Sequence, residues 1–153
     1  MGFGEGDDEE TLIKYLRTIV PRGSSRVTVH NAGGGSPEKI ITKAIRFGAI
    51  GYNRAFIVMD SDVVLPKSYE KKARAAGFKI IKSVPCLEGM LLSVIESKTN
   101  WARKTSKECV KYFEKKYNEI NTRSLAKLFP PKILKKIKNK KHTLRQILLI
   151  LTK

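Results

Sequence analysis

The feature that most constrains the fold is a short apolar run at residues 55–59 (AFIVM), in which no polar side chain is available to face water. A strand with one solvent-exposed face alternates apolar and polar residues, so this run is typical of a strand covered on both faces. Weaker strand patterns occur at 26–30 and 79–84. Segments with helical spacing of apolar residues separate the strands, at 10–20, 37–47, 67–76 and 87–95. This alternation predicts an α/β fold, with a mainly parallel sheet flanked by helices.

The strand signals stop near residue 98. Beyond that point we expect only helices, at 104–120, 123–129, 132–138 and 143–151, separated by Asn121, Pro130-Pro131 and Asn139. No internal repeat is visible. We therefore predict an α/β domain over residues 1–97 and a basic α-helical extension over residues 98–153.

Positive charge is concentrated in the second part. The chain has 31 basic and 14 acidic side chains, a net charge of +17, and residues 98–153 carry 17 of the basic and 3 of the acidic ones, a net of +14. So many cations attract polyanions by counterion release, and nucleic acid is the commonest such partner. The alternative is a solvated helical surface without a partner. We predict contact with DNA or RNA.

Other classes of protein fit the composition poorly. Apolar runs such as 147–151 are too short to cross a bilayer, and the acidic residues that follow Met1 do not resemble a signal peptide. Cys86 and Cys109 form no CxxC pair, and a chain with only two cysteines and two histidines does not favour a four-ligand zinc site. We expect a cytoplasmic protein in a reducing compartment, not bound to a membrane. A partner protein and a homo-oligomer both stay open.

Carboxylates follow the apolar run directly. Asp60 and Asp62 stand two positions apart, which places both side chains on one side of an extended segment. In open α/β sheets, ligands bind at the carboxyl ends of the strands. Neighbouring carboxylates repel each other unless a cation intervenes, and oxygen ligands of this kind suit Mg²⁺ or Mn²⁺. The alternative is that Asp60 caps a turn and Asp62 is merely exposed.

Two other glutamates occupy comparable positions. Glu5 and Gly6 precede the first predicted helix, where the first strand-to-helix loop would be, and Glu88 follows the strand at 79–84. Carboxylates thus follow three separate strand positions. Glu88 has an alternative role as a first-turn carboxylate that interacts with the helix dipole. Asp7 and Asp8 fit capping and dipole roles better than metal binding, although Asp7 stays open as an outer ligand.

The ordered combination of GEGDDEETLIKYL, FIVMDSD and SVPCLEGMLLSVI resembles the Toprim domain, the metal-dependent module of topoisomerases, primases, and OLD-type and RloB-like nucleases. In that family a glutamate with glycine follows the first strand and a DxD follows a later one. Here these are Glu5-Gly6 and Asp60-Ser61-Asp62. The third stretch, with its Pro-Cys and Glu88 opening an apolar helix, looks most like the RloB-like branch. The resemblance covers about residues 3–97.

The resemblance implies a Toprim-like, Rossmann-like sheet and a metal-dependent nuclease. Asp60 and Asp62 would bind one or two Mg²⁺ ions, Glu5 would act as a metal ligand, general acid or base, and Glu88 would be an accessory ligand. Topoisomerases use a tyrosine from another domain, and none is evident here, so water is the simpler nucleophile. A role in phage defence or nucleic-acid processing is implied by the resemblance alone.

Two alternatives remain. One is a non-catalytic nucleic-acid-binding protein that retains the Toprim fold. The other is a phosphoacceptor receiver domain, which also gathers aspartates at strand ends, here Asp7, Asp8 and Asp60, but needs no polycationic tail.

Candidate nucleic-acid contacts lie in the extension. Trp101 stands among cations and could stack on an unpaired base, the alternative being core packing. The segment 132–138 (KILKKIK) is basic and amphipathic, and suits phosphate, an anionic membrane or a partner. The predicted nucleic-acid contacts are Trp101, Arg103, Lys104, Lys132, Lys135, Lys136, Lys138, Lys140 and Lys141.

A glycine run at 33–36 (GGGS) opens the helix predicted at 37–47. Free backbone N–H groups at such a position could receive a phosphate, but the run lacks the GxxxxGK[ST] pattern of a P-loop. We favour a flexible turn. His30, Cys86 and Cys109 are best interpreted as structural residues, and His142 as solvent-facing.

Overall fold

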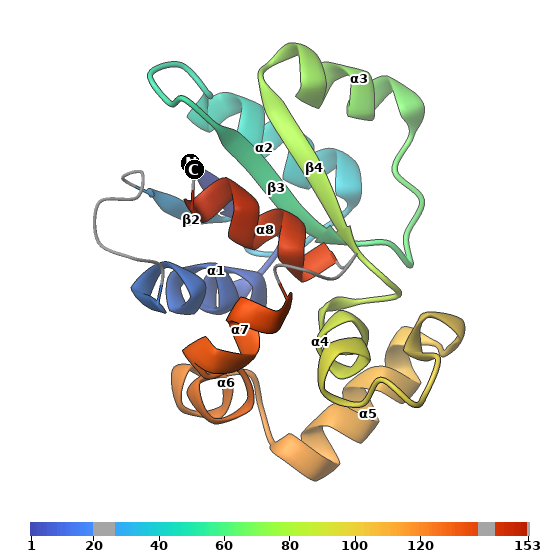
Figure 1. Ribbon diagram of the computed structural model, residues 1–153. Coiled ribbons are helices and arrows are strands. Elements are labelled where there is room, and N and C mark those ends of the chain that lie inside the picture. Colours follow the sequence, from blue (N-terminus) through green and yellow to red (C-terminus); the bar gives the residue numbers. More distant parts are fainter. Residues whose placement is uncertain (20–26, 138–142, 153) are drawn as a thin grey trace.

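The computed structural model of the chain describes residues 1–19, 27–137 and 143–152. Four parallel strands form one sheet in the order β2-β1-β3-β4 (Figure 1). The strands are β1 (Gly2–Gly4), β2 (Val29–Asn31), β3 (Ala55–Asp60) and β4 (Phe78–Ser83). The predicted α/β class with a parallel sheet flanked by helices is confirmed.

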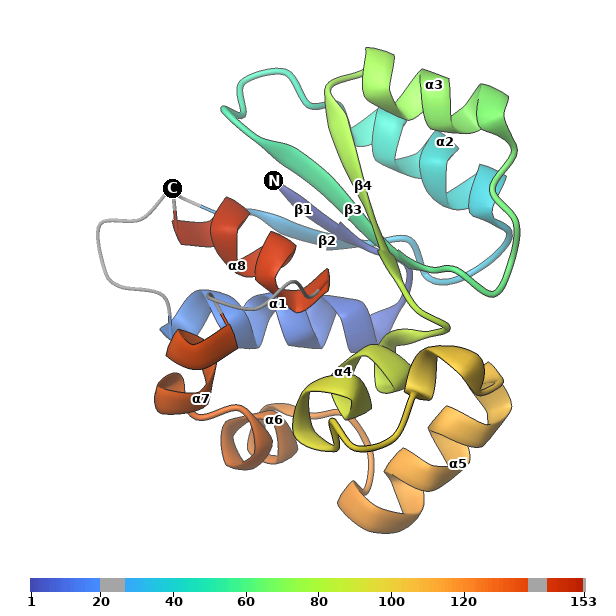
Figure 2. The same cartoon turned by 45° about the vertical axis from the view of Figure 1, so that its right-hand side comes forward.

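Helices cover both faces of the sheet (Figure 2). On one face, α2 (Pro37–Phe47) and α3 (Lys67–Ala75) enclose a core that includes Ile57 and Met59; on the other, α1 (Asp7–Ile19) and α8 (Thr143–Thr152) enclose a core that includes Phe56 and Val58. Successive side chains of a strand point to opposite faces. Residues 55–59 are therefore all apolar because both faces of β3 are buried, as the sequence predicts.

The remaining helices lie on the side of the sheet that α1 and α8 cover (Figure 2). They are α4 (Leu87–Ile95), a 3₁₀ turn η1 (Trp101–Arg103), α5 (Ser106–Tyr117), α6 (Thr122–Leu128) and α7 (Pro131–Ile137). Capping boxes start α5 and α6: Thr105 pairs with Glu108, and Asn121 with Ser124. Each box satisfies two backbone groups that the helix start leaves free. Within the described ranges, no helix combines the length and apolarity needed to cross a membrane.

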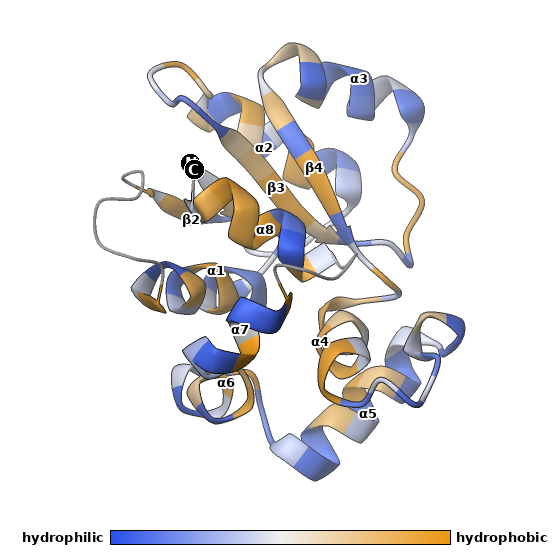
Figure 3. Cartoon of the chain, in the orientation of Figure 1, coloured by the Kyte–Doolittle hydropathy of each residue, from blue (hydrophilic) through white to orange (hydrophobic). Residues whose placement is uncertain are grey.

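Residues from both predicted parts share one core. The cluster that contains Leu12 and Phe56 also contains Phe113, Phe129 and Ile147. The hydroxyl of Tyr15 in α1 donates a buried 2.7 Å hydrogen bond to the carbonyl of Phe129. Figure 3 shows that α8 is mostly hydrophobic, which suits a helix lying on the sheet. In the same view α7 is largely hydrophilic, which suits a helix nearer the surface. The division near residue 98 stays a prediction, but the two sides of it are packed together.

Candidate active site

Two of the candidate site residues, Glu5 and Asp60, lie next to each other at the carboxyl end of the sheet. Strands β1 and β3 are neighbours, with Gly4 opposite Val58. Glu5 directly follows β1, and its N–H donates a 3.0 Å hydrogen bond to the carbonyl of Val58. The N–H of Asp60 donates a 2.8 Å hydrogen bond to Oε2 of Glu5. Burial raises the pKa of Glu5, the bond from Asp60 opposes this rise, and repulsion from Asp62 adds to it.

Asp60 carries a carboxylate oxygen whose hydrogen-bonding capacity is unused. Its Oδ1 is buried and has no hydrogen-bond partner within the described part of the chain. Burial, followed by repulsion from Glu9, Glu5, Glu88 and Asp62, raises the pKa of Asp60 to about 8. Burying a polar atom without a partner is costly, and more so for a charged one. The oxygen is therefore suited to accept a proton or a cation.

Glu9 is part of this cluster, and our sequence analysis missed it. Its residue is only 6% exposed, and its carboxylate accepts a 2.9 Å hydrogen bond from the N–H of Gly6. Burial raises its pKa to about 7, the hydrogen bonds lower it, and Glu5 and Asp8 repel it. The sequence contained a signal: Glu9 stands three and seven positions before Leu12 and Leu16, on the buried face of α1.

Asp60 and Glu88 share a pocket of about 420 Å³. Glu88 is half-buried in the first turn of α4. Asp62 is exposed just beyond β3, and neither it nor Glu5 is among the described residues that line the pocket, although both lie close enough to repel Asp60. The lining consists of Gly6, Asp7, Asp8, Glu9, Asp60, Leu87, Glu88 and Val110.

Two glycines allow the elements around the pocket to approach closely. A Cβ on Gly4 would lie 2.8 Å from Cβ of Glu9, so only glycine lets α1 return this close to β1. A Cβ on Gly89 would lie 2.5 Å from Cδ of Pro85 and 3.1 Å from Sγ of Cys109. Gly89 thus fixes α4 against the segment after β4, and this places Glu88 beside Asp60.

The glycine run at 33–36 lies next to the cluster as a turn. Gly33, Gly34 and Gly35 all have positive φ, and the N–H of Gly34 donates a 2.9 Å hydrogen bond to the carbonyl of Glu5. Asn31 donates from Nδ2 to Asp7 at 2.6 Å and to Glu10 at 3.0 Å. These contacts tie Asp7 to β2, in keeping with its interpretation as a structural carboxylate. His30 stacks on Phe47, with ring centroids 4.4 Å apart.

The donor chemistry of the cluster suits Mg²⁺ or Mn²⁺. No group of three or more His, Cys, Asp or Glu side chains in the described ranges is arranged to hold a metal ion. Mg²⁺, however, commonly binds through one or two carboxylates and keeps several of its waters. Asp60, with its unpaired buried oxygen, fits that requirement, and Glu5 and Glu88 are the neighbouring oxygen donors.

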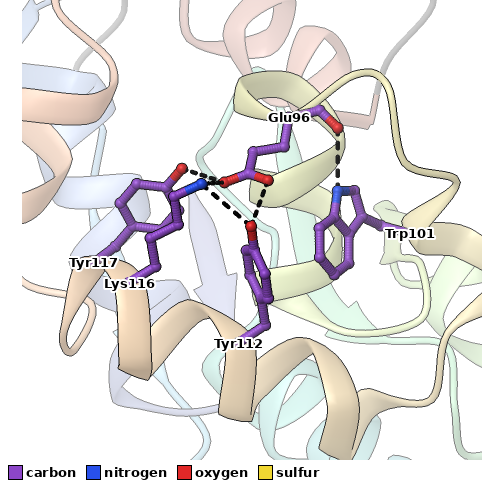
Figure 4. A network of polar contacts seen from close by, with 5 residues as sticks. All are labelled: Glu96, Trp101, Tyr112, Lys116 and Tyr117. Atoms are coloured by element: carbon purple, nitrogen blue, oxygen red, sulfur yellow. Dashed lines mark hydrogen bonds and ion pairs between the residues drawn. The ribbon is translucent and has the colours of Figure 1, made fainter.

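Trp101 is packed inside the protein. The residue is 5% exposed, its Nε1 donates a 3.1 Å hydrogen bond to the carbonyl of Glu96, and its ring lies 4.7 Å from that of Tyr112 (Figure 4). Glu96 also accepts hydrogen bonds from the hydroxyls of Tyr112 and Tyr117 and pairs with Lys116. The core alternative describes Trp101 correctly, and stacking on a base would require the ring to leave this position.

The other predicted nucleic-acid contacts divide into two groups. Arg103, Lys104, Lys132, Lys135 and Lys136 are exposed, and Lys104 forms an ion pair with Glu108 at 3.5 Å. Lys138, Lys140 and Lys141, like His142, lie outside the described residues.

Cys86 and Cys109 are free and buried, 1% and 0% exposed, and burial raises the pKa of both thiols. Their interpretation as small buried hydrophobic residues is confirmed.

Comparison of the chain with protein-family models, with curated protein sequences and with solved structures found no match. The resemblance to the Toprim family therefore depends on the sequence motifs alone.

Proposed function

We propose that this protein is a Mg²⁺-dependent, Toprim-type nuclease that hydrolyses phosphodiester bonds of nucleic acid. The observation that carries the proposal is the buried Oδ1 of Asp60, which has no hydrogen-bond partner among the described residues. It lies among the carboxylates of Glu5, Glu9 and Glu88 at the carboxyl end of a parallel sheet. Such a concentration of carboxylates is unfavourable without a cation. A role in phage defence or in nucleic-acid processing follows only from the RloB-like resemblance.

Each side chain of the cluster has a proposed role that follows from its position. Asp60, together with Glu5, Glu88 or Asp62, would hold the ion. Bound Mg²⁺ supplies stabilisation of phosphate charge and lowers the pKa of a bound water. Glu5 is oriented by the N–H of Asp60 and can accept a proton from the attacking water. Glu9 keeps the turn at Gly6 in place through its hydrogen bond to the N–H of that residue.

The charge of the chain supports a polyanionic substrate. The net charge is +17, although the pocket itself is acidic. A nucleic acid would be attracted by the net positive charge of the chain, and a metal ion held by the carboxylates would offset their repulsion of its phosphate. A phosphoacceptor receiver domain would not need this excess of basic side chains.

A second candidate is a nucleic-acid-binding protein that keeps the fold without turnover. It is favoured by the finding that, in the described ranges, no group of three or more His, Cys, Asp or Glu side chains is arranged to hold a metal ion. The two candidates differ in a measurable way, because only the nuclease requires the carboxylates for its effect on nucleic acid.

A cleavage assay separates these candidates. The wild-type chain is incubated with plasmid DNA, single-stranded DNA and a structured RNA, in Mg²⁺ or in EDTA, beside Asp60→Asn, Glu5→Gln and a control, Glu70→Gln. Glu70 pairs with Arg74 on α3, outside the cluster. We expect Mg²⁺-dependent cutting that falls by about 100-fold or more in the first two variants and is retained in the control. Cutting that persists in Asp60→Asn, or wild-type binding without any cutting, would refute the nuclease.

A further inference from the structure

Three lysines recur at every fourth position of α5 and are not among the nucleic-acid contacts predicted from the sequence. Lys107, Lys111 and Lys115 are all exposed. Side chains at i, i+4 and i+8 lie on one face of a helix, with about 6 Å of rise between successive members. We propose that this row binds the phosphate backbone of a nucleic-acid strand at the edge of the acidic pocket. The proposal depends on the function given above and deepens it.

The ammonium groups of the row are free to bind phosphate. None of the three makes an ion pair with the part of the chain that the structure describes, whereas the neighbouring Lys104 and Lys116 pair with Glu108 and Glu96. Lysines already held by a carboxylate have less to gain from a phosphate. The row is therefore a better phosphate-binding surface than the neighbouring Lys104, which the sequence predicted as a contact.

The orientation of α5 is held by contacts on its other faces. Cys109 and Phe113 are completely buried in the core. Tyr112 and Tyr117 donate hydrogen bonds to Glu96, and Figure 4 shows these side chains converging on its carboxylate. Because these contacts prevent the helix from rotating, the row stays in solvent. The backbone of α5 is already ordered, so binding of a ligand costs little backbone conformational entropy.

The row begins beside the acidic pocket. Val110 of α5 lines that pocket together with Asp60 and Glu88. Lys107 precedes Val110 by one turn, and Lys111 follows it directly. The metal-free pocket is acidic and repels phosphate, so cations beside it favour the approach of a strand. The row supplies such cations along about 12 Å of helix, which is two intervals of four residues.

Neither acidic residue of α5 forms an ion pair with the row in the part of the chain that the structure describes. Glu108 closes the capping box with Thr105. Glu114 lies close enough to Asp8 to contribute, after burial and nearer carboxylates, to the raised pKa of that residue. Glu114 thus belongs with the acidic edge of the pocket.

The basic residues predicted on α7 are less well placed. Lys132, Lys135 and Lys136 are exposed, but Figure 2 shows α7 well separated from the amino end of α1, where Asp7 and Asp8 begin the helix. A strand held only by α7 would not be held at the pocket. We therefore assign the positioning of substrate to α5.

Binding measured without metal tests this assignment independently of catalysis. Two variants remove three charges each: Lys107→Gln/Lys111→Gln/Lys115→Gln on α5, and Lys132→Gln/Lys135→Gln/Lys136→Gln on α7. Fluorescence anisotropy in EDTA follows binding of a labelled 20-nucleotide strand and its duplex, as DNA and as RNA. We expect the α5 variant to bind about 10-fold or more weakly, and the slope of log K against log[salt] to fall by about 2 for single strands. The α7 variant should lose less than about 3-fold. Restoring the charges as arginines on α5 should restore binding.

The outcomes distinguish the two proposals. Normal binding by the folded α5 variant, a larger loss in the α7 variant, or no binding by the wild-type protein would overturn the lysine row. Thermal unfolding confirms that both variants are folded. A wild-type protein that binds through α5 but cuts nothing in Mg²⁺ would keep the row and refute the nuclease. If the wild-type protein cuts nucleic acid in Mg²⁺ but the α5 substitutions leave binding unaffected, the nuclease is kept and the lysine row is refuted.

Discussion

The main-chain N–H of Asp60 donates a 2.8 Å hydrogen bond to the carboxylate of Glu5, which is 55 positions away in the sequence. The bond joins the ends of two neighbouring strands, β1 and β3. It also holds the carboxylate of Glu5 near that of Asp60. The same contact therefore gains a hydrogen bond and suffers repulsion between two carboxylates. Substitutions of Glu5 can separate the two effects.

We expect Glu5→Gln to retain stability and Glu5→Ala to lose it. Both variants lack the charge, but glutamine keeps an oxygen that can accept the hydrogen bond from Asp60, whereas alanine leaves that N–H unpaired. The free energy of unfolding of the alanine variant should be about 1 kcal/mol lower than that of the glutamine variant. Urea unfolding in EDTA at pH 8 measures the difference. Equal stabilities would show that the bond contributes nothing.

Asp60 should make the metal-free protein less stable as the pH rises. Its pKa is about 8 in the folded chain and about 3.9 in an unfolded one, so the folded state binds more protons between these values. The free energy of unfolding therefore falls with increasing pH, and the stabilisation present at low pH is lost by pH 8. Glu9, with a pKa of about 7, acts in the same direction.

Asparagine at position 60 carries no ionisable group, so Asp60→Asn should not lose stability as the pH rises towards 8 through this residue. At pH 8 in EDTA we expect Asp60→Asn to unfold at least about 2–4 °C above the wild type, which corresponds to about 1 kcal/mol in a chain of this size. The gain should shrink towards pH 5. Glu70→Gln, which changes a carboxylate on α3, should leave the slope with pH as it is in the wild type. An Asp60→Asn variant with the wild-type slope would contradict the assignment.

Mg²⁺ or Mn²⁺ should stabilise the wild-type protein through the same residue. At a concentration about 100 times the dissociation constant, binding to the folded state adds about 2.7 kcal/mol. The midpoint of thermal unfolding at pH 8 should rise by about 5 °C or more, and Asp60→Asn should lose most of the rise. An equal rise in both proteins would place the metal elsewhere.

Gly89→Ala should destabilise the fold and displace Glu88. The added methyl would lie 2.5 Å from Cδ of Pro85, and overpacking of this kind costs about 1–3 kcal/mol. Gly6→Ala is the matched control, because its nearest contact would be an ordinary 3.5 Å to Glu9. Denaturant unfolding of both variants tests the difference. A fully stable Gly89→Ala would show that α4 can move away from Pro85.

Trp101→Leu should lower stability without weakening binding to single strands. The substitution removes buried ring surface and the hydrogen bond to the carbonyl of Glu96, at an expected cost of about 2 kcal/mol. A base-stacking role would instead cost about 1–3 kcal/mol of binding per base. Unfolding and anisotropy on the same folded sample compare the two losses. Weaker binding with unchanged stability would favour stacking.

Local sequence accounts for several elements closely. The predicted helices at 37–47 and 87–95 match α2 and α4, and the apolar run at 55–59 lies within β3. Pro37 stands at the start of α2, and Gly48 with positive φ follows its last residue. These signals act through backbone sterics and local hydrogen bonds, which need no distant partner.

Tertiary contacts decided other features. The strand predicted at 26–30 is observed at Val29–Asn31, where its residues pair with the three of β1, and residue 26 is outside the described ranges. The burial of Glu9 depends on the packing of α1 against the sheet, although its spacing from Leu12 and Leu16 is visible in the sequence. Core packing of Trp101 is one of two alternatives from the sequence, and only the fold shows its contacts with Glu96 and Tyr112.

The sequence alone determined the class of fold, the order of its elements and the carboxylates that follow its strands, because hydrophobic period and local chain geometry carry that information. It did not determine that β1 lies beside β3, that α8 covers the sheet or that α5 borders the acidic pocket. Those relationships depend on which buried surfaces pack together across long separations in the chain. Only that packing brings Glu5 within hydrogen-bonding distance of Asp60.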